Sequence, residues 1–246
     1  MGPSRAAAKA ALRDELVARL RPVARPDHRH HWELLEFIAD FEGSEAATRR
    51  LVADPSYAAA STLLVTPDNG LRRLRERVLL DGRRLLVPTC GIRRGFLLLD
   101  GSGLSAAEAA LGSTMEGIGE LARPVTLREI AAAARPDLLV TGALGVTAAG
   151  LRLGKGRGYF DLEWALLREV GAVPADAPVA VLVHDVQVVE AALPMEPHDV
   201  VADLVVTPTR SIATGRTGPR VARLERERVT PAMLDAIPQL RELLRG

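Results

Sequence analysis

Short apolar runs alternate with amphipathic stretches along residues 61–207. The runs are rich in Leu and Val and predict buried strands at 62–66, 84–88, 95–99, 138–147, 178–183 and 200–206. Between several of them, apolar residues recur about every three to four positions, which predicts helices at 71–80, 127–134 and 159–170. This alternation is typical of an α/β protein with a mostly parallel sheet and helices on both faces. In such folds, functional residues gather beyond the carboxyl ends of the strands.

The segments on either side of this alternation differ in character. At the N-terminal end, helical spacing predicts a helix at 5–21 capped by Ser4, followed by shorter helices at 32–41 and 44–52. We expect this helical segment, residues 1–55, to pack on the core of a single domain covering residues 1–246. The four glycines of 102–124 predict an irregular, flexible segment or lid. Further on, 221–229 is expected to be an edge strand or extended, and Thr230-Pro231 starts a last helix.

Composition narrows the class of protein. Hydrophobic residues make up 48% of the 246 and charged residues 26%, which excludes a disordered chain. The net charge of +1 provides no overall field for nucleic acid, and two Trp, two Tyr and four Phe are too few for a base-stacking surface. No apolar run approaches the roughly 20 residues of a membrane span, and no apolar core follows the N-terminus as in a signal peptide. We therefore expect a soluble cytoplasmic protein, monomer or homodimer, without nucleic-acid or membrane partners.

The single cysteine, Cys90, excludes an intramolecular disulfide and is consistent with a reducing compartment. We expect its side chain to be a small, buried apolar group, and not a nucleophile.

The richest concentration of candidate chemistry lies in the stretch from Gly150 to Asp161, between a predicted strand and a predicted helix. Within Gly150 to Gly158, nine positions hold four glycines and three basic residues. Glycines allow backbone N–H groups to approach an anion, and the N-terminus of the following helix adds partial positive charge. The spacing is not that of a Walker A loop, which would need glycine at position 149 and Ser or Thr at position 156. The alternative is a glycine-rich solvated turn with incidental charges.

Three stretches in the same order resemble the 5-formyltetrahydrofolate cyclo-ligases, also called methenyltetrahydrofolate synthetases. Gly150-x-Arg-Leu-Gly-Lys-Gly-x-Gly-Tyr-Phe-Asp161 is similar to the family's ATP loop, G-x-R-L-G-x-G-x-G-Y-Y-D. Gln187 and the stretch from Leu193 to Thr207 resemble its second signature, and Lys9-x-x-x-Arg13 resembles its opening K-x-x-L-R. The resemblance implies a cyclo-ligase-like, Rossmann-like three-layer fold.

The likeness is closer to a divergent, synthetase-domain-containing branch of this family. That branch carries G-K-G-x-G-x-x-D-x-E, which matches the stretch from Gly154 to Glu163, and also T-P-T-R, which matches Thr207 to Arg210. Two features of the cyclo-ligases are altered. Their pterin-holding glutamate in an E-V-D-like element is replaced by Pro67-Asp68-Asn69, and their E-P pair ahead of the glycine loop is missing. Phosphate-handling residues are thus better retained than folate-handling ones.

By this resemblance, the expected reaction uses ATP and Mg²⁺ to phosphorylate the formyl oxygen of 5-formyltetrahydrofolate. A neighbouring nitrogen then attacks the activated carbon, and phosphate leaves as 5,10-methenyltetrahydrofolate forms. Two alternatives stay open. The protein can apply the same chemistry to another pterin or to a heterocycle such as one of thiamine metabolism, or it can be a non-catalytic binding module.

Resemblance and charge together assign the site residues. The ATP-binding set is Lys9, Arg13, Gly154, Lys155, Gly156, Arg157, Gly158, Tyr159 and Asp161, with Arg152, Lys155 and Tyr159 as the catalytic residues. Asp68 and Gln187 are expected to contact the substrate, and Asp161 and Asp199 to bind Mg²⁺, which favours one or two carboxylates beside phosphate oxygens.

Each of these assignments has a structural alternative. Lys9 and Arg13 can be solvated surface residues, and Tyr159 can be a core side chain. Asp161 can balance the dipole of the following helix, and Asp199 can belong to a turn.

Overall fold

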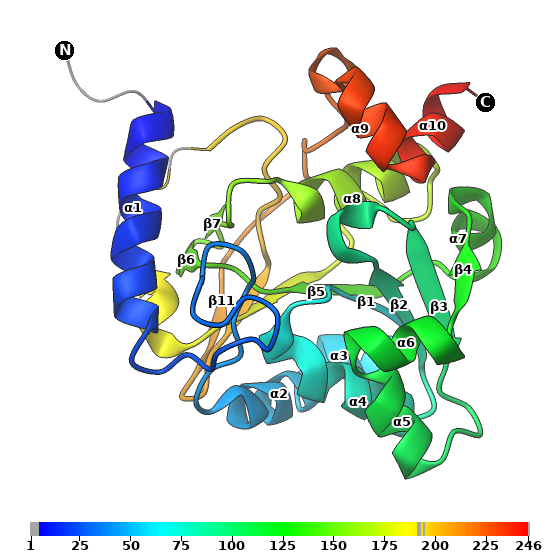
Figure 1. The fold of residues 1–246 in the computed structure, drawn as a ribbon, viewed down its shortest axis with the longest axis horizontal. Helices are drawn as coiled ribbons and strands as arrows, with labels where there is room; N and C mark the ends of the chain where they lie inside the picture. The colour runs from blue at the N-terminus through cyan, green and yellow to red at the C-terminus, as the bar shows by residue number, and fades with distance from the viewer. Residues whose placement is uncertain (1–4, 191–192, 194, 246) are drawn as a thin grey trace.

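A computed structural model describes residues 5–190, 193 and 195–245, so Ser4, the predicted N-cap of the first helix, lies outside the described residues. Within this part of the chain the main sheet has eight strands in the order β11-β10-β8-β5-β1-β2-β3-β4 (Figure 1). The bounds are β1 (Thr62–Val65), β2 (Arg84–Pro88), β3 (Phe96–Asp100), β4 (Arg123–Val125), β5 (Leu138–Thr141), β8 (Val179–Leu182), β10 (Leu204–Val206) and β11 (Ser211–Ala213). The five strands β10, β8, β5, β1 and β2 run parallel, β11 pairs antiparallel with β10, and β3 pairs antiparallel with both β2 and β4.

Helices cover both faces of this sheet, which confirms the predicted fold class. One face carries α2 (Ser44–Val52), α3 (Pro55–Ala59), η1 (Asn69–Leu71), α4 (Arg72–Leu80), α5 (Ala106–Gly112) and α6 (Met115–Leu121). The other carries η2 (Cys90–Ile92), α7 (Leu127–Ala133), α8 (Tyr159–Glu169), α9 (Pro231–Ala236) and α10 (Pro238–Arg245). Alternate strand residues enter the two cores, as Leu64 packs with α8 while Leu63 and Val65 pack with α4. No described helix combines the length and the hydropathy needed to cross a membrane.

The remaining elements lie beside this three-layer core. A small sheet holds β6 (Gly145–Thr147) between β7 (Arg152–Leu153) and β9 (Val188–Val189). Helix α1 (Arg5–Leu20) packs near this sheet and near η3 (Asp185–Gln187), while η4 (Arg226–Arg228) precedes α9.

A topological switch point lies between the parallel neighbours β1 and β5. After β1 the chain passes to α4 on one face of the sheet, whereas after β5 it continues through β6 and β7 to α8 on the other. The two connections diverge at the carboxyl edge, and in open α/β sheets a crevice of this kind is where ligands bind.

Several predicted strands are shorter than their apolar runs. The run at 138–147 is divided into β5 and β6, because Gly142 turns the chain and donates its N–H to the Asp68 carboxylate at 2.9 Å. Of 200–206 only the last three residues are strand, and 221–229 contains η4 and no described strand. The antiparallel edge strand β11 was not predicted.

The predicted helix at 32–41 is wrong. This segment consists of turns, held by isolated β-bridges that pair Ala24 with Phe41 and Asp27 with His31. The buried Asp27 carboxylate also accepts hydrogen bonds from two backbone N–H groups of the turn that follows it. Within 32–41 the backbone forms turn bonds, such as the one from the Glu36 N–H to the Glu33 carbonyl, and the Asp40 carbonyl accepts from the Arg25 N–H.

The prediction of an irregular segment at 102–124 is also wrong, because the segment forms α5, α6 and β4. A capping box between Ser105 and Glu108 starts α5, and the Thr114 side chain caps α6. Two of the glycines are packing positions. An added Cβ would lie 2.7 Å from Leu99 at Gly112 and 2.3 Å from the Leu111 carbonyl oxygen at Gly117.

Candidate functional site

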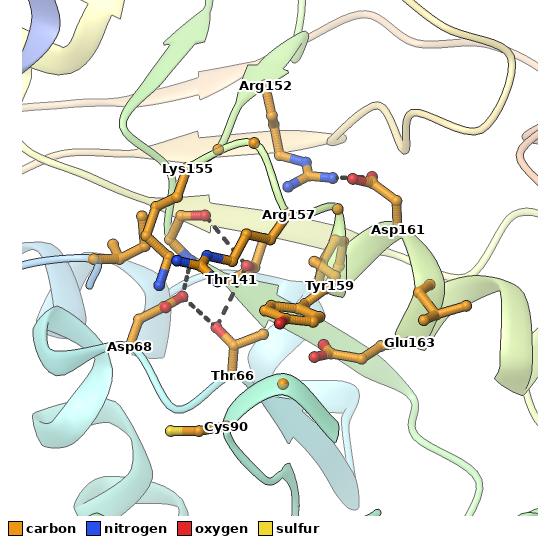
Figure 2. A pocket seen from close by; sticks show the side chains of 18 of the residues that line it. Thr66, Asp68, Cys90, Thr141, Arg152, Lys155, Arg157, Tyr159, Asp161 and Glu163 are labelled. Atoms are coloured by element: carbon orange, nitrogen blue, oxygen red, sulfur yellow. Dashed lines mark hydrogen bonds and ion pairs between the residues drawn. The ribbon is translucent and has the colours of Figure 1, made fainter. Parts of the chain in front are cut away.

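A cavity of about 930 Å³ lies at the switch point of the sheet, where the carboxyl ends of β1 and β5 meet the glycine loop. This volume is in the range of small-molecule sites. Segments far apart in the sequence line it, and Figure 2 shows several of the side chains converging there. They include parts of α1, the turns at 29–38, the loop 66–69, η2, residues 152–165, residues 196–199 and residues 223–233. The predicted location of the site at the carboxyl edge therefore agrees with the cavity.

The glycine loop, residues 154–158, connects β7 to α8 and forms one wall of the cavity. Gly156 has a φ of 97° and Gly158 a φ of 64°, so the loop uses backbone conformations that side chains disfavour. Gly158 is the N-cap of α8 and supplies no side-chain cap to the first N–H groups of the helix. Since these groups are an anion-binding feature of helix N-termini, the wall can receive a phosphate.

Gly156→Ala is expected to lower the free energy of unfolding by about 1–3 kcal/mol, because a non-glycine residue at this φ is strained. Its Cβ would also lie 3.1 Å from the guanidinium carbon of Arg13, which donates to the Gly154 carbonyl at 2.9 Å. Gly154→Ala is the matched control, since nothing lies within 4 Å of its added Cβ. Urea denaturation of both variants measures the difference. Equal losses of stability would contradict the role assigned to Gly156.

The predicted phosphate-binding cations all line the cavity, and each has a partner within the protein. Lys155 donates to the Glu36 carbonyl at 3.0 Å, and Arg157 pairs with the Glu36 carboxylate at 2.9 Å. Lys9 lies 3.6 Å from Asp199. Lys9, Arg13, Lys155 and Arg157 come from two distant segments, so the fold has brought them to one wall. A phosphate group entering there would exchange with these existing partners.

Arg152 differs from the other basic residues because its guanidinium is only 6% exposed. It donates to the Val200 carbonyl at 3.0 Å and to the Asp161 carboxylate at 2.5 Å, and it stacks over the ring of Phe160. The Asp161 carboxylate also accepts from the Val200 N–H. In this arrangement Arg152 and Asp161 fasten the glycine loop and α8 to the segment that precedes β10.

The two carboxylates predicted for magnesium, Asp161 and Asp199, both line the cavity. Asp161 is bonded to Arg152, while Asp199 lies near Lys9 and accepts from the Glu196 N–H at 2.8 Å. In the part of the chain that the structure describes, no three His, Cys, Asp or Glu side chains are grouped so that they hold a metal ion. The protein alone therefore offers no preformed metal cage, and most ligands of a magnesium ion would come from phosphate oxygens and water.

Asp68 follows the end of β1 and lines the cavity. Its Oδ2 accepts from the Thr66 hydroxyl at 2.5 Å and from the Gly142 N–H at 2.9 Å, and so it joins the ends of β1 and β5 (Figure 2). The buried Arg75 holds the same loop by donating to the carbonyls of Thr66 and Asp68. Burial lowers the pKa of Arg75 to about 10, so it remains charged at neutral pH. Sequence reasoning gave Arg75 no role.

Gln187, the second predicted substrate residue, is buried and lies outside the cavity lining. Its amide nitrogen donates to the carbonyls of Ala143 and Leu144 at 2.6 and 3.3 Å, and its oxygen accepts from the His184 N–H at 2.7 Å. The side chain thus supports the connection between β5 and β6, and we do not carry it into the proposed site.

Tyr159 and Cys90 both line the cavity. Tyr159 lines the cavity and packs against the core under α8, so it combines the two roles considered from the sequence. Its ring crowds Gly91, where an added Cβ would be 3.2 Å from the Tyr159 hydroxyl oxygen. The expectation that Cys90 is buried is wrong, because η2 turns its thiol outward and leaves it exposed.

Glu163 is a cavity residue that belongs to the matched motif but for which no role was predicted. It lies in the first half of α8, is only 3% exposed, and is among the lining residues. Its Oε2 is buried and makes no hydrogen bond within the described residues. Burial raises the pKa of Glu163 well above its usual value, and the nearby Asp68 and Asp161 raise it further, partly offset by Arg152.

The fold and the site together define an α/β protein with a ligand-sized cavity at the switch point of its sheet, bordered by a cation-bearing glycine loop. The sequence profile of the 5-formyltetrahydrofolate cyclo-ligase family matches residues 5–208. The chain belongs to this family.

Individual relatives agree with this assignment. The chain is 35% identical over 209 residues to a mouse (Mus musculus) protein named methenyltetrahydrofolate synthase domain-containing protein, covering 84% of this chain and 55% of that protein. The human (Homo sapiens) protein of the same name is 34% identical over 209 residues, covering 84% of this chain and 54% of that one. The chain thus spans about half the length of these curated relatives.

Among solved structures, the 5,10-methenyltetrahydrofolate synthetase of Aquifex aeolicus matches with a TM-score of 0.51 at 20% sequence identity, covering 85% of this chain and 94% of that chain. At this identity the likeness establishes the fold.

Proposed function

We propose that the chain catalyses the ATP-dependent conversion of 5-formyltetrahydrofolate to 5,10-methenyltetrahydrofolate. The observation that carries this proposal is the cavity itself. The glycine loop and its cations line it together with the carboxyls of Asp68 and Glu163. A ligand with a phosphate group at one end and a polar heterocycle at the other is complementary to such a site. Family membership and the names of the relatives favour a folate as that heterocycle.

In the proposed reaction the formyl oxygen attacks the terminal phosphorus of ATP, and ADP departs. The neighbouring nitrogen then attacks the activated carbon and loses its proton to solvent, and phosphate leaves with the former formyl oxygen. Phosphoryl transfer of this kind requires mainly positioning and electrostatic stabilisation from the protein. Lys155, Arg157 and Arg13 would neutralise the phosphates, and Tyr159 would border the point of transfer between the two substrates.

In this proposal magnesium binds together with the triphosphate. Bound there, it would neutralise charge on the phosphates. Asp161 and Asp199 both line the cavity, and each is engaged in an ion pair. We propose that they act by holding Arg152 and Lys9 in place, and that either one contacts the metal only after its cation turns to the phosphates.

Formation of the methenyl product, followed by its absorbance with purified protein, Mg-ATP and 5-formyltetrahydrofolate, tests the proposal. Product that depends on ATP would support it. ATP binding without any product would instead favour a different heterocycle. The altered element at Pro67-Asp68-Asn69 is the specific observation behind that second candidate, since the family's pterin-holding glutamate is replaced there.

Asp68→Asn is expected to raise the KM for 5-formyltetrahydrofolate about 10-fold or more, while the affinity for Mg-ATP stays within about 3-fold. Asparagine keeps an oxygen that can accept from Gly142 but loses the charge, and a charged hydrogen bond to the substrate is worth roughly 1.5–3 kcal/mol. Steady-state kinetics with each substrate varied in turn separates the two effects. Asp176→Asn, which changes an exposed carboxyl outside the cavity lining, is the control. An unchanged KM in Asp68→Asn would remove Asp68 from the folate side.

A further inference from the structure

The Glu163 side chain points into the cavity (Figure 2). Its Oε2 atom is buried and makes no hydrogen bond with the described residues. Buried polar groups in folded proteins are nearly always hydrogen-bonded, because leaving one unsatisfied costs about 1–3 kcal/mol. Other side chains of the cavity follow this rule, as Asp68 and Asp161 each accept two hydrogen bonds. An exception in the wall of a ligand-sized cavity indicates that the missing partner is supplied by a ligand.

We propose that the Glu163 carboxyl binds the heterocycle of the substrate by accepting a hydrogen bond from a ring N–H. This inference rests on the proposed function and deepens it, because it assigns a specificity-determining residue to the heterocycle side of the same site.

The chemistry of this contact follows from the position of the carboxyl. Glu163 lines the cavity and its buried Oε2 is a hydrogen-bond acceptor, so the missing partner is a donor. A ring N–H is an uncharged donor that a heterocycle carries into the cavity. Asp68, Asp161 and Arg152 are the charged side chains that act on this carboxyl. Cys90 and Tyr159 line the same cavity.

The same surroundings select against other ligand groups. A ligand carboxylate or phosphate placed at Glu163 would meet the carboxylates of Asp68 and Asp161, and Arg152, the positive charge that acts there, is already paired with Asp161. The phosphates are therefore directed toward Lys155 and Arg157, and the uncharged edge of a heterocycle toward Glu163. Charge therefore orients the phosphates of ATP and the heterocycle of the second substrate before the reaction begins.

Binding of pterin tests this inference, since its pyrimidinone ring carries a ring N–H but no formyl group. Isothermal titration is performed with pterin and, separately, with Mg-ATP on wild type, Glu163→Gln and Glu163→Met. Glutamine keeps an oxygen acceptor and is expected to bind pterin within about 3-fold of wild type. Methionine keeps the length of the side chain without the acceptor and is expected to lose about 10-fold or more. Glu169→Gln, an exposed position near the end of α8, is the matched control.

A ligand-side measurement does not depend on any variant folding. Pterin methylated on its ring amide nitrogen cannot donate, and it is expected to bind wild type about 10-fold or more weakly than pterin. Equal binding of the two pterins, unchanged pterin binding in Glu163→Met, or no pterin binding to wild type would each overturn the inference. A parallel loss of Mg-ATP binding in Glu163→Met would also overturn it, since that pattern indicates a structural role.

The methenyl assay separates this inference from the proposed function. Glu163-dependent pterin binding without methenyl product would contradict the cyclo-ligase reaction and leave the inference standing. Product formation by Glu163→Met with the KM of wild type would contradict the inference and leave the reaction standing.

Discussion

Lys155→Ala is expected to weaken Mg-ATP binding about 10-fold or more. Lys155 lies in the glycine loop, lines the cavity, and uses its ammonium group to hold a single backbone carbonyl, that of Glu36. In the presence of a triphosphate that weak partner would be exchanged for phosphate oxygens. A charge-assisted hydrogen bond contributes roughly 1.5–3 kcal/mol, and about 1.4 kcal/mol corresponds to a tenfold change in affinity. Isothermal titration at fixed ionic strength measures the difference.

Arg128→Ala is the control for this prediction, because Arg128 is an exposed cation of α7 outside the cavity lining. It removes the same formal charge and tests whether the effect depends on location or on net charge. Raising the salt concentration should reduce the difference in Mg-ATP affinity between wild type and Lys155→Ala, since exposed electrostatic contacts are screened. Identical affinities in wild type and Lys155→Ala would place the triphosphate elsewhere, with Arg13 and Lys9 as the next cations to test.

The regular part of the fold is predictable from the sequence because its signals are local and mutually consistent. The strands β1, β2 and β8 are mainly apolar, and all of their residues except Arg84 are buried, as expected for strands buried on both faces. The segment 32–41 shows the limit of this reasoning. Its apolar residues Leu34 and Phe37 are buried, but against Leu20 and Leu144, through backbone bridges that periodicity does not reveal.

The prediction for segment 102–124 is wrong because regular structure was missed there. Glycines were read as breakers of regular structure, yet Gly112 and Gly117 sit where a neighbouring side chain or backbone approaches too closely for a Cβ. The caps at Ser105 and Thr114 were present in the sequence and were the better signal.

For the site, sequence motifs located the segments but not the partner of each side chain. The glycine loop and the Lys9 to Arg13 segment indeed meet at one cavity. Arg152 belongs to the motif from Gly150 to Asp161 and Gln187 to the second signature. The polar groups of both side chains are nevertheless engaged within the protein. Glu163 is the converse case. On a helix a glutamate predicts a solvated face, and only the packed structure reveals that this one is buried without a partner.

Glu163→Gln is expected to make the protein more stable than wild type at alkaline pH, and about equally stable near pH 5. The sign follows from the raised pKa of Glu163, whose usual value is 4.5. Above that value the unfolded chain releases the proton while the folded protein keeps it. The stability of wild type therefore falls, by about 1.4 kcal/mol per pH unit, until pH reaches the folded-state pKa. Glutamine has no proton to release, so its variant does not share this loss.

Guanidinium unfolding of both proteins at pH values from 5 to 9 measures the effect as a difference in the free energy of unfolding. All other ionisable groups are the same in both proteins, so their contributions largely cancel in the comparison. Glu169→Gln repeats the same chemical change at an exposed position of α8 and should follow wild type at every pH. A constant difference across the range would mean that Glu163 ionises as freely in the folded protein as in the unfolded chain.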